Sequence, residues 1–198
     1  MSVTLPDQNM TLLSATDTVL VVVDVQERLV PAVSDRDQIV WNTRRLIDGA
    51  KLFDVPVIVT EQYPKGLGPT MPELIVALPE NTPVMEKKSF SACRVPEFLE
   101  ELRRRESVCK VLLAGMETHV CILQTALDLL SLGYEVHLVV DAVGSRFAGD
   151  RRIALRRLES SGVLLTTTES VLFQWCRTAD APQFKAVSNL VREERMPF

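Results

Sequence analysis

Short apolar runs alternate along the chain with longer stretches in which apolar residues recur at helical spacing. The runs are rich in Val, Ile and Leu, and they lack the alternation of apolar and polar residues found in strands with one solvated face. Strands buried on both faces have this composition, as in a parallel sheet. We therefore predict six parallel strands, over Thr18–Val23, Val55–Thr60, Val84–Lys87, Val111–Ala114, Val136–Val140 and Val163–Thr167.

The sequence predicts helices between and after these strands. Ile39, Leu46 and Ala50 lie on one face of a helix that runs from about Asp37 to Phe53. Repetition of strand and helix is typical of the α/β class, so we predict a three-layer sandwich with helices on both faces of the sheet. The other predicted helices are Pro96–Arg105, Cys121–Leu132, Asp150–Ser160, Glu169–Trp175 and Phe184–Arg192.

The longest irregular stretch, Glu61–Pro72, holds three prolines and two glycines in twelve residues. This composition predicts a loop, at a length where loops are often functional. Its Gly66-Leu67-Gly68 segment does not open a helix directly after a strand, so the sequence lacks a dinucleotide-binding fingerprint.

Length and composition fit one globular domain. The chain has 198 residues, of which 46% are hydrophobic and 24% charged, and these values are not those of a disordered protein. No linker divides the sequence. We expect a single domain over residues 1–198, with a core from about residue 18 to residue 191 and short tails at both ends.

Charge and apolar runs argue against two kinds of partner. The net charge is −4 and no basic block occurs, so we predict no nucleic acid partner. The apolar run Val19–Val23 has five residues, against the roughly 20 that a membrane helix needs. The absence of Lys and Arg before Arg28 argues against a secretory leader. The four cysteines are scattered and form no Cys-x-x-Cys pair, so we expect a reduced, cytoplasmic protein.

Reactive side chains stand at three predicted strand ends. Asp24 ends the first strand, Lys87 ends the third, and Cys121 begins the helix after the fourth. In an open parallel sheet, ligands bind beyond the carboxyl ends of the strands. The N-terminus of a helix favours the thiolate form of Cys121. Asp24 is the candidate base that takes the thiol proton, and Lys87 is the candidate cation that activates the thiol further. Backbone amides in the turn Gly115–Cys121 are candidates to stabilise an oxyanion.

Each of these residues also has an ordinary explanation. Asp24 is of a type that often caps a helix or closes a turn. A cysteine in the first turn of a helix is commonly a small packed side chain. Lys87 lies in a short charged cluster with Glu86 and Lys88, which fits a solvated surface. The common position of the three at strand ends is what favours the catalytic interpretation.

The chain resembles the isochorismatase-like cysteine hydrolases over nearly its whole length, in order from about residue 18 to residue 191. The stretch after the second strand is most similar to the isochorismatase domain-containing proteins. The segments that carry the resemblance are Val23-Asp24-Val25-Gln26, Thr60-Glu61-Gln62-Tyr63-Pro64-Lys65-Gly66-Leu67-Gly68-Pro69, Glu86-Lys87-Lys88-Ser89-Phe90-Ser91 and Gly115-Met116-Glu117-Thr118-His119-Val120-Cys121.

The resemblance implies a six-stranded parallel sheet of order 3-2-1-4-5-6 and a catalytic triad of Asp24, Lys87 and Cys121. Lys87 rather than Lys88 matches the family lysine, which lies three residues before an aromatic residue. In this order the lysine lies two strands from the aspartate, about 10 Å at ~4.8 Å per strand, so its side chain must reach across the second strand. The family also has a cis peptide before the cysteine, which corresponds to Met116-Glu117.

Within the family, the sequence favours some activities over others. Isochorismatases proper generally lack the nucleophilic cysteine, and the nicotinamidase metal site needs a histidine in the loop after the second strand, where Glu61–Pro72 has none. We therefore expect a metal-independent hydrolase without a cofactor that cleaves a C–N bond of a small amide through a Cys121 thioester. The family resemblance favours a homo-oligomer, a dimer or tetramer.

The expected oxyanion donors are the amides of Glu117 and Cys121, in the turn that contains Met116. Side chains in the matching strand-end segments are candidates for the wall of the substrate pocket. They are Gln26, Leu29, Tyr63 and Phe90.

Other interpretations remain open. A binding or scaffold protein that has lost catalysis would keep the same fold. A redox thiol protein would pair Cys121 with Cys93, and a Cys–His dyad would use His119 instead of Asp24. Iodoacetamide labelling separates the enzyme from the scaffold, because an activated Cys121 is expected to react near pH ~6–7, before the other thiols.

Overall fold

The computed structural model describes residues 12–105 and 107–194. Its strands form one parallel sheet of six strands in the order β3-β2-β1-β4-β5-β6. The predicted fold class and strand order are confirmed. The strands are β1 (Thr18–Val23), β2 (Val57–Gln62), β3 (Val84–Lys87), β4 (Lys110–Met116), β5 (Glu135–Gly144) and β6 (Leu164–Thr166).

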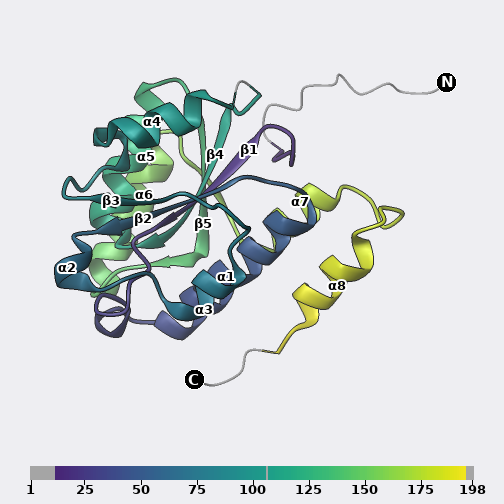
Figure 1. The fold of residues 1–198 in the computed structure, drawn as a ribbon, viewed down its shortest axis with the longest axis horizontal. Helices are drawn as coiled ribbons and strands as arrows, with labels where there is room; N and C mark the ends of the chain where they lie inside the picture. Colours follow the sequence, from purple (N-terminus) through teal and green to yellow (C-terminus); the bar gives the residue numbers. More distant parts are fainter. Residues whose placement is uncertain (1–11, 106, 195–198) are drawn as a thin grey trace.

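Helices cover both faces of the sheet (Figure 1). On one face lie α1 (Arg36–Leu52), α3 (Pro72–Ala77), α7 (Thr168–Cys176) and α8 (Phe184–Arg192). On the other lie α4 (Pro96–Arg103), α5 (Leu123–Ser131) and α6 (Ala148–Ser160). Within the two described ranges, no helix is both long and apolar enough to cross a lipid bilayer.

The buried core explains the unbroken apolar runs. Successive side chains of a strand point to opposite faces, and β1 supplies both layers. Leu20 and Val22 pack in the cluster beneath α1, while Val19, Val21 and Val23 pack in the cluster beneath α4 and α5. All five side chains are fully buried. Since both faces of this strand are covered, all five residues after Thr18 are apolar.

The prediction of a loop after β2 is only partly correct. Glu61 and Gln62 extend β2, the segment Pro64–Leu67 forms one helical turn (α2), and Pro72 begins α3, which the sequence analysis did not predict. Proline is well suited to the first turn of a helix because its fixed φ is helical and it needs no amide partner there. Two of the three prolines that suggested a loop, Pro64 and Pro72, therefore begin short helices.

Candidate functional site

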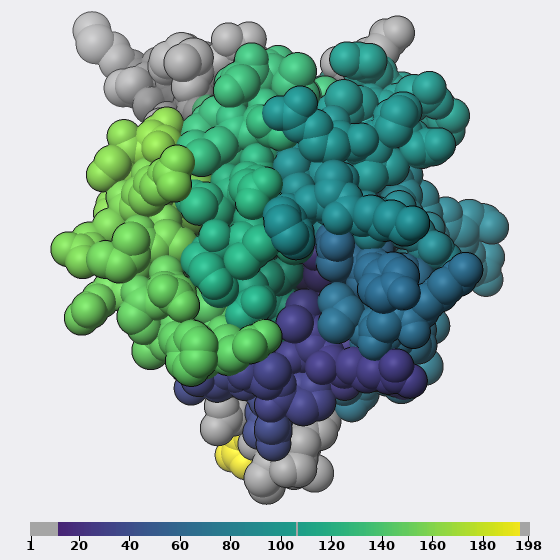
Figure 2. All heavy atoms as spheres, turned by 90° about the vertical axis from the view of Figure 1, so that its left-hand side faces the viewer, coloured from purple at the N-terminus to yellow at the C-terminus, as the bar shows by residue number. Residues whose placement is uncertain are grey.

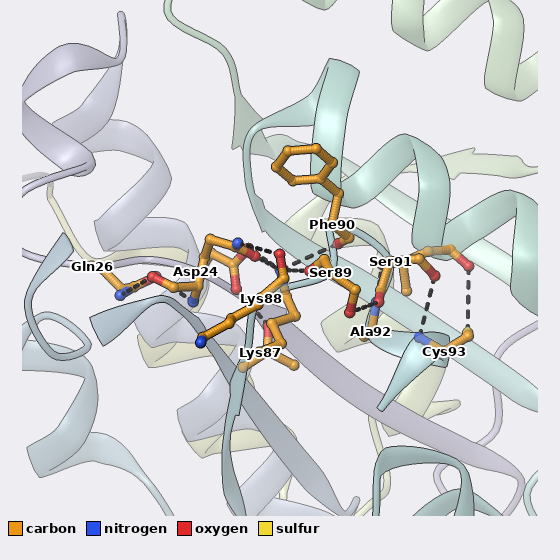
Figure 3. A network of polar contacts seen from close by, with 12 residues as sticks. Asp24, Gln26, Lys87, Lys88, Ser89, Phe90, Ser91, Ala92 and Cys93 are labelled. Atoms are coloured by element: carbon orange, nitrogen blue, oxygen red, sulfur yellow. Dashed lines mark hydrogen bonds and ion pairs between the residues drawn. The ribbon is translucent and has the colours of Figure 1, made fainter. Parts of the chain in front are cut away.

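An ion pair joins the ends of β1 and β3 across β2. Lys87 is the last residue of β3, and its Nζ donates a hydrogen bond to Oδ2 of Asp24 at 2.6 Å. Both side chains are 0% exposed. Lys87 thus does reach across the intervening strand, which was the most demanding requirement of the expected arrangement. Figure 3 shows the pair and the polar contacts that extend from it.

Two residues of β2 fill the gap between these partners, and sequence reasoning missed both. The Thr60 hydroxyl donates to Oδ1 of Asp24 at 2.7 Å, and Oε1 of Gln62 accepts from Lys87 Nζ at 2.7 Å. Residues two apart in a strand point to the same face. This spacing at the carboxyl end of the strand between Asp24 and Lys87 is the signal that was available in the sequence.

Cys121 lies beside this pair in a π-helical turn, Thr118–Ile122 (η3), between β4 and α5. Its side chain is buried. The Asp24 carboxyl and the Lys87 ammonium both affect the pKa of its thiol, so the three groups lie close together. The prediction that Cys121 begins the α-helix is wrong, because α5 begins two residues later, at Leu123.

The environment of Cys121 contradicts the prediction that its thiolate is favoured. The pKa of the thiol is raised to about 12, first because burial disfavours the charged form and second because the Asp24 carboxyl is close. The Lys87 ammonium lowers the pKa of the thiol, but by less than burial raises it. Burial also raises the pKa of the Asp24 carboxyl, against the effect of Lys87. Burial therefore disfavours both anions, and it makes the Asp24 carboxylate a stronger base than an exposed one.

The turn that carries Cys121 begins with a backbone that only glycine can adopt easily. Gly115 has φ +118°, and a Cβ there would lie 2.0 Å from the carbonyl oxygen of Val23, on β1. The peptide bond between Met116 and Glu117 is cis, as the family resemblance implied. The Glu117 carboxylate accepts the Arg146 backbone amide at 2.8 Å, so it binds the neighbouring loop and not Asp24.

The four expected pocket residues fall into two groups. Gln26 is 0% exposed, and its side-chain amide binds backbone groups of Gln62 and Gly68. Because its side chain is enclosed and its polar atoms are occupied, Gln26 anchors the segment after β2 instead of facing open space. Leu29 is only partly buried and packs against the core beneath α1.

Tyr63 and Phe90 are the two expected pocket residues with open surface, at 50% and 51% exposed. Their backbones are tied to the cluster, because the Tyr63 amide donates to the Lys87 carbonyl and the Phe90 carbonyl accepts from Lys87 Nζ. In Figure 3 the Phe90 ring points away from the ion pair. Phe90 lines a cavity beside the loop that follows Lys87, and Tyr63 does not.

This face of the molecule is hollowed. In Figure 2 a depression lies where the purple, blue and green segments meet, on the side that carries the carboxyl ends of the strands. The cavity that Phe90 lines, beside the loop that follows Lys87, has a volume of about 210 Å³. Its lining residues are Ser89, Phe90, Ser91, Arg94, Gln124, Leu127 and Asp128.

The geometry bears on the two alternative uses of Cys121. The His119 ring contacts the Ser145 hydroxyl at 3.0 Å and lies 3.9 Å from the Asp150 carboxylate, so its ring nitrogens are directed toward α6. Cys93 is buried, and its thiol contacts the Thr125 carbonyl. All four cysteines are free thiols. Among the residues described, no group of three or more His, Cys, Asp or Glu side chains is arranged to hold a metal ion.

Fold and site together define a parallel α/β protein with an acid, a lysine and a cysteine at the switch point of its sheet. The isochorismatase domain model matches residues 18–170. The chain belongs to the isochorismatase family. It is 45% identical over 175 residues to isochorismatase domain-containing protein 2A of Mus musculus, an alignment that covers 88% of this chain and 82% of the mouse protein.

Solved structures agree with this assignment. The MAR1 ribonuclease of Caenorhabditis elegans is 42% identical, with a TM-score of 0.89 over 94% of this chain and 95% of that one. YcaC from Pseudomonas aeruginosa, solved with hexane-2,5-diol and covalent acrylamide, is 27% identical with a TM-score of 0.84 over 91% of each chain. YcaC from Escherichia coli, described as an octameric hydrolase of unknown specificity, is 27% identical with a TM-score of 0.85 over 94% of this chain and 92% of that one.

Proposed function

We propose that this protein is a metal-independent cysteine hydrolase that cleaves the C–N bond of a small amide. The observation that carries the proposal is the buried contact of Asp24 with Lys87, with the Cys121 thiol beside both. A nucleophile, a base and a fixed cation are the groups that acyl transfer requires. A relative that holds covalent acrylamide supports a reactive nucleophile in this fold.

In the proposed first half-reaction, the Asp24 carboxylate removes the thiol proton as the sulfur attacks the amide carbon. Base assistance is needed because the pKa of the thiol is about 12, so free thiolate is scarce at neutral pH. A C–S bond forms and the carbonyl oxygen becomes an oxyanion, which the amides of Glu117 and Cys121 hold. Asp24 then passes the proton to nitrogen, the C–N bond breaks, and the amine leaves.

In the second half-reaction, water attacks the thioester carbon. Asp24 takes a proton from this water, the C–S bond breaks, and the thiol recovers the proton from Asp24. A carboxylic acid is released and the site returns to its starting state. Lys87 stays charged throughout and stabilises the carboxylate, because its role is electrostatic.

The site favours an uncharged substrate over a phosphodiester. The nematode relative is named as a ribonuclease, and an RNA substrate brings phosphate charge that needs cationic partners. Here the Lys87 ammonium is buried against Asp24, Gln62 and the Phe90 carbonyl, and the whole chain carries a net charge of −4. We therefore propose a neutral small molecule as substrate and no nucleic acid partner.

The direct test is a mass-spectrometric screen of small primary amides, with acrylamide as the electrophilic probe. We expect a covalent adduct on Cys121 and, for a substrate amide, loss of ammonia with an acyl group on the sulfur. Cys121→Ala should abolish both adduct and turnover. Cys93→Ala, which alters another buried thiol, is the matched control and should retain them.

Two outcomes oppose the proposal. Turnover that persists in Cys121→Ala removes the cysteine from the mechanism. A folded protein whose Cys121 resists acrylamide as strongly as Cys93 does would favour the non-catalytic binding protein. Degradation of an RNA oligonucleotide that is lost in Cys121→Ala would favour a nuclease.

We further propose a cytoplasmic homo-oligomer. The support for assembly is the octameric Escherichia coli relative, and the support for a cytoplasmic location is the scattered cysteine pattern, with all four thiols free.

A further inference from the structure

The Lys87 ammonium has an acceptor for each of its three protons. One goes to Asp24 Oδ2 at 2.6 Å and one to Gln62 Oε1 at 2.7 Å. The third faces two backbone carbonyls, those of Phe90 at 3.2 Å and Ser89 at 3.4 Å. Every one of these partners is an oxygen that can only accept in this contact. The site is therefore built for the charged form of lysine, pointed in one direction.

Gln62 is the side chain that completes this arrangement. Its Oε1 accepts from Lys87 while its Nε2 donates to the Lys88 carbonyl at 2.9 Å, so the amide cannot flip without losing both hydrogen bonds. Its own backbone is fixed in turn, because its amide N–H donates to the buried Gln26 side chain at 2.7 Å. A Lys87 side chain without this partner would have one proton unoccupied and freedom to turn away from Asp24.

We propose that Gln62 is a positioning residue of the cysteine site: it holds the Lys87 ammonium against Asp24, so that Lys87 acts as a fixed cation and donates no proton to substrate. The inference deepens the proposed hydrolase function and rests on it for its consequence in catalysis. The contact itself does not depend on which substrate is cleaved. Gln62 acts through Lys87 and does not touch the reacting atoms.

The consequence for Asp24 follows from the groups that face its carboxyl. These are Lys87 from β3 and Cys121 from η3, with the Thr60 hydroxyl from β2. The neighbouring acids are directed elsewhere, since Glu61 binds Thr70 and Glu117 binds the Arg146 amide. Lys87 is thus the cation that opposes the effect of burial. Loosening it raises the pKa of Asp24 further and leaves less carboxylate to act as base.

The test is a titration of the Asp24 carboxyl carbon by ¹³C NMR in wild type, Gln62→Met and Gln26→Met. Methionine keeps the length of the side chain and removes the amide. We expect the Asp24 midpoint to rise by about one pH unit in Gln62→Met. Gln26→Met removes the hydrogen bond to the Gln62 backbone amide but keeps the Gln62 side-chain amide that contacts Lys87, so it should lower stability and shift the Asp24 midpoint less than Gln62→Met does.

An unchanged Asp24 midpoint in folded Gln62→Met would overturn the inference, and so would an equal shift in Gln26→Met. If Gln62→Met does not fold, ¹⁵N NMR of wild-type Lys87 decides: a neutral amine at pH ~7, or an ammonium that exchanges freely with solvent, contradicts the arrangement. These measurements need no substrate. A shifted midpoint without any amide adduct on Cys121 would therefore reject the hydrolase function and keep the role of Gln62.

Discussion

At the scale of single residues, the Thr60 hydroxyl stabilises the buried Asp24 carboxylate alongside Lys87. Thr60 donates to Oδ1 of Asp24 at 2.7 Å and is 1% exposed. A hydrogen bond to a buried charged group is worth about 1.5–3 kcal/mol, and its loss leaves an acceptor unsatisfied. The strand-end argument found Asp24 and Lys87, but it ended β2 at Thr60 and placed Gln62 in a loop. Polar residues at the end of a strand look like the start of a loop unless the partner strand is known.

We predict that Thr60→Val lowers the free energy of unfolding at pH ~7 by about 1.5–3 kcal/mol. Valine has the shape of threonine without its hydroxyl, so packing is retained. Thr43→Val is the control, because the Thr43 hydroxyl is buried and finds no hydrogen-bond partner among the described residues. That variant should be neutral or stabilising. Urea denaturation measures both, and equal losses in the two variants would contradict the role of Thr60.

At the level of elements, the close approach of β4 to β1 places the turn of Cys121 beside Asp24. Gly115 pairs with Val23, the residue before Asp24, and no other residue type fits between these backbones. The register of β4 with β5 shifts between Leu113 and Gly115, so the irregularity falls at the same point. Glycine in the sequence signalled a turn there. It did not signal the π-helical turn, because that depends on how α5 packs after it.

We predict that Gly115→Ala lowers the free energy of unfolding by about 3 kcal/mol or more, or prevents folding. The new Cβ would lie 2.0 Å from the Val23 carbonyl oxygen at φ +118°, which combines overpacking with a left-handed backbone. Gly133→Ala separates the two causes. Its φ is +88° with no atom within 4 Å of the new Cβ, so it should cost only about 1–2 kcal/mol. Similar losses for both variants would show that the contact with Val23 is unimportant.

At the scale of the whole molecule, the sequence was most informative where an apolar run or a helical stripe is unbroken. The strand Thr18–Val23 and the helix Phe184–Arg192 have the predicted bounds. An uninterrupted apolar run fits only a strand that is covered on both faces, and a strong apolar stripe at helical spacing fits only a helix with one face on the core. The segment after β2 was predicted less well. Its short helices are held by long-range contacts, such as those of Gln26 with Gly68 and of Glu61 with Thr70, and such contacts have no local pattern.

The assembly state is a prediction for the intact chain. We expect multi-angle light scattering to give a mass that is a multiple of the 22.2 kDa subunit, with dimer or tetramer as the expected species. The homologous octamer shows that this fold can assemble in a relative. A single species of about one subunit mass, unchanged over a tenfold range of protein concentration, would contradict the proposed oligomer.

The central claim is that Asp24, Lys87 and Cys121 work as one unit, and the pH dependence of Cys121 alkylation by acrylamide tests it most directly. Below its pKa, an isolated thiol reacts about tenfold faster for each unit by which the pH is raised, because the thiolate is the nucleophile. If Asp24 takes the proton, the rate of Cys121 should level off once Asp24 is ionised and fall as acid protonates it, at a pH above the usual range of a carboxyl group because burial raises the pKa of Asp24. N-acetylcysteine provides the reference slope, and Asp24→Asn should abolish the plateau. A Cys121 rate that climbs with pH as the reference does, in wild type and Asp24→Asn alike, would contradict the account.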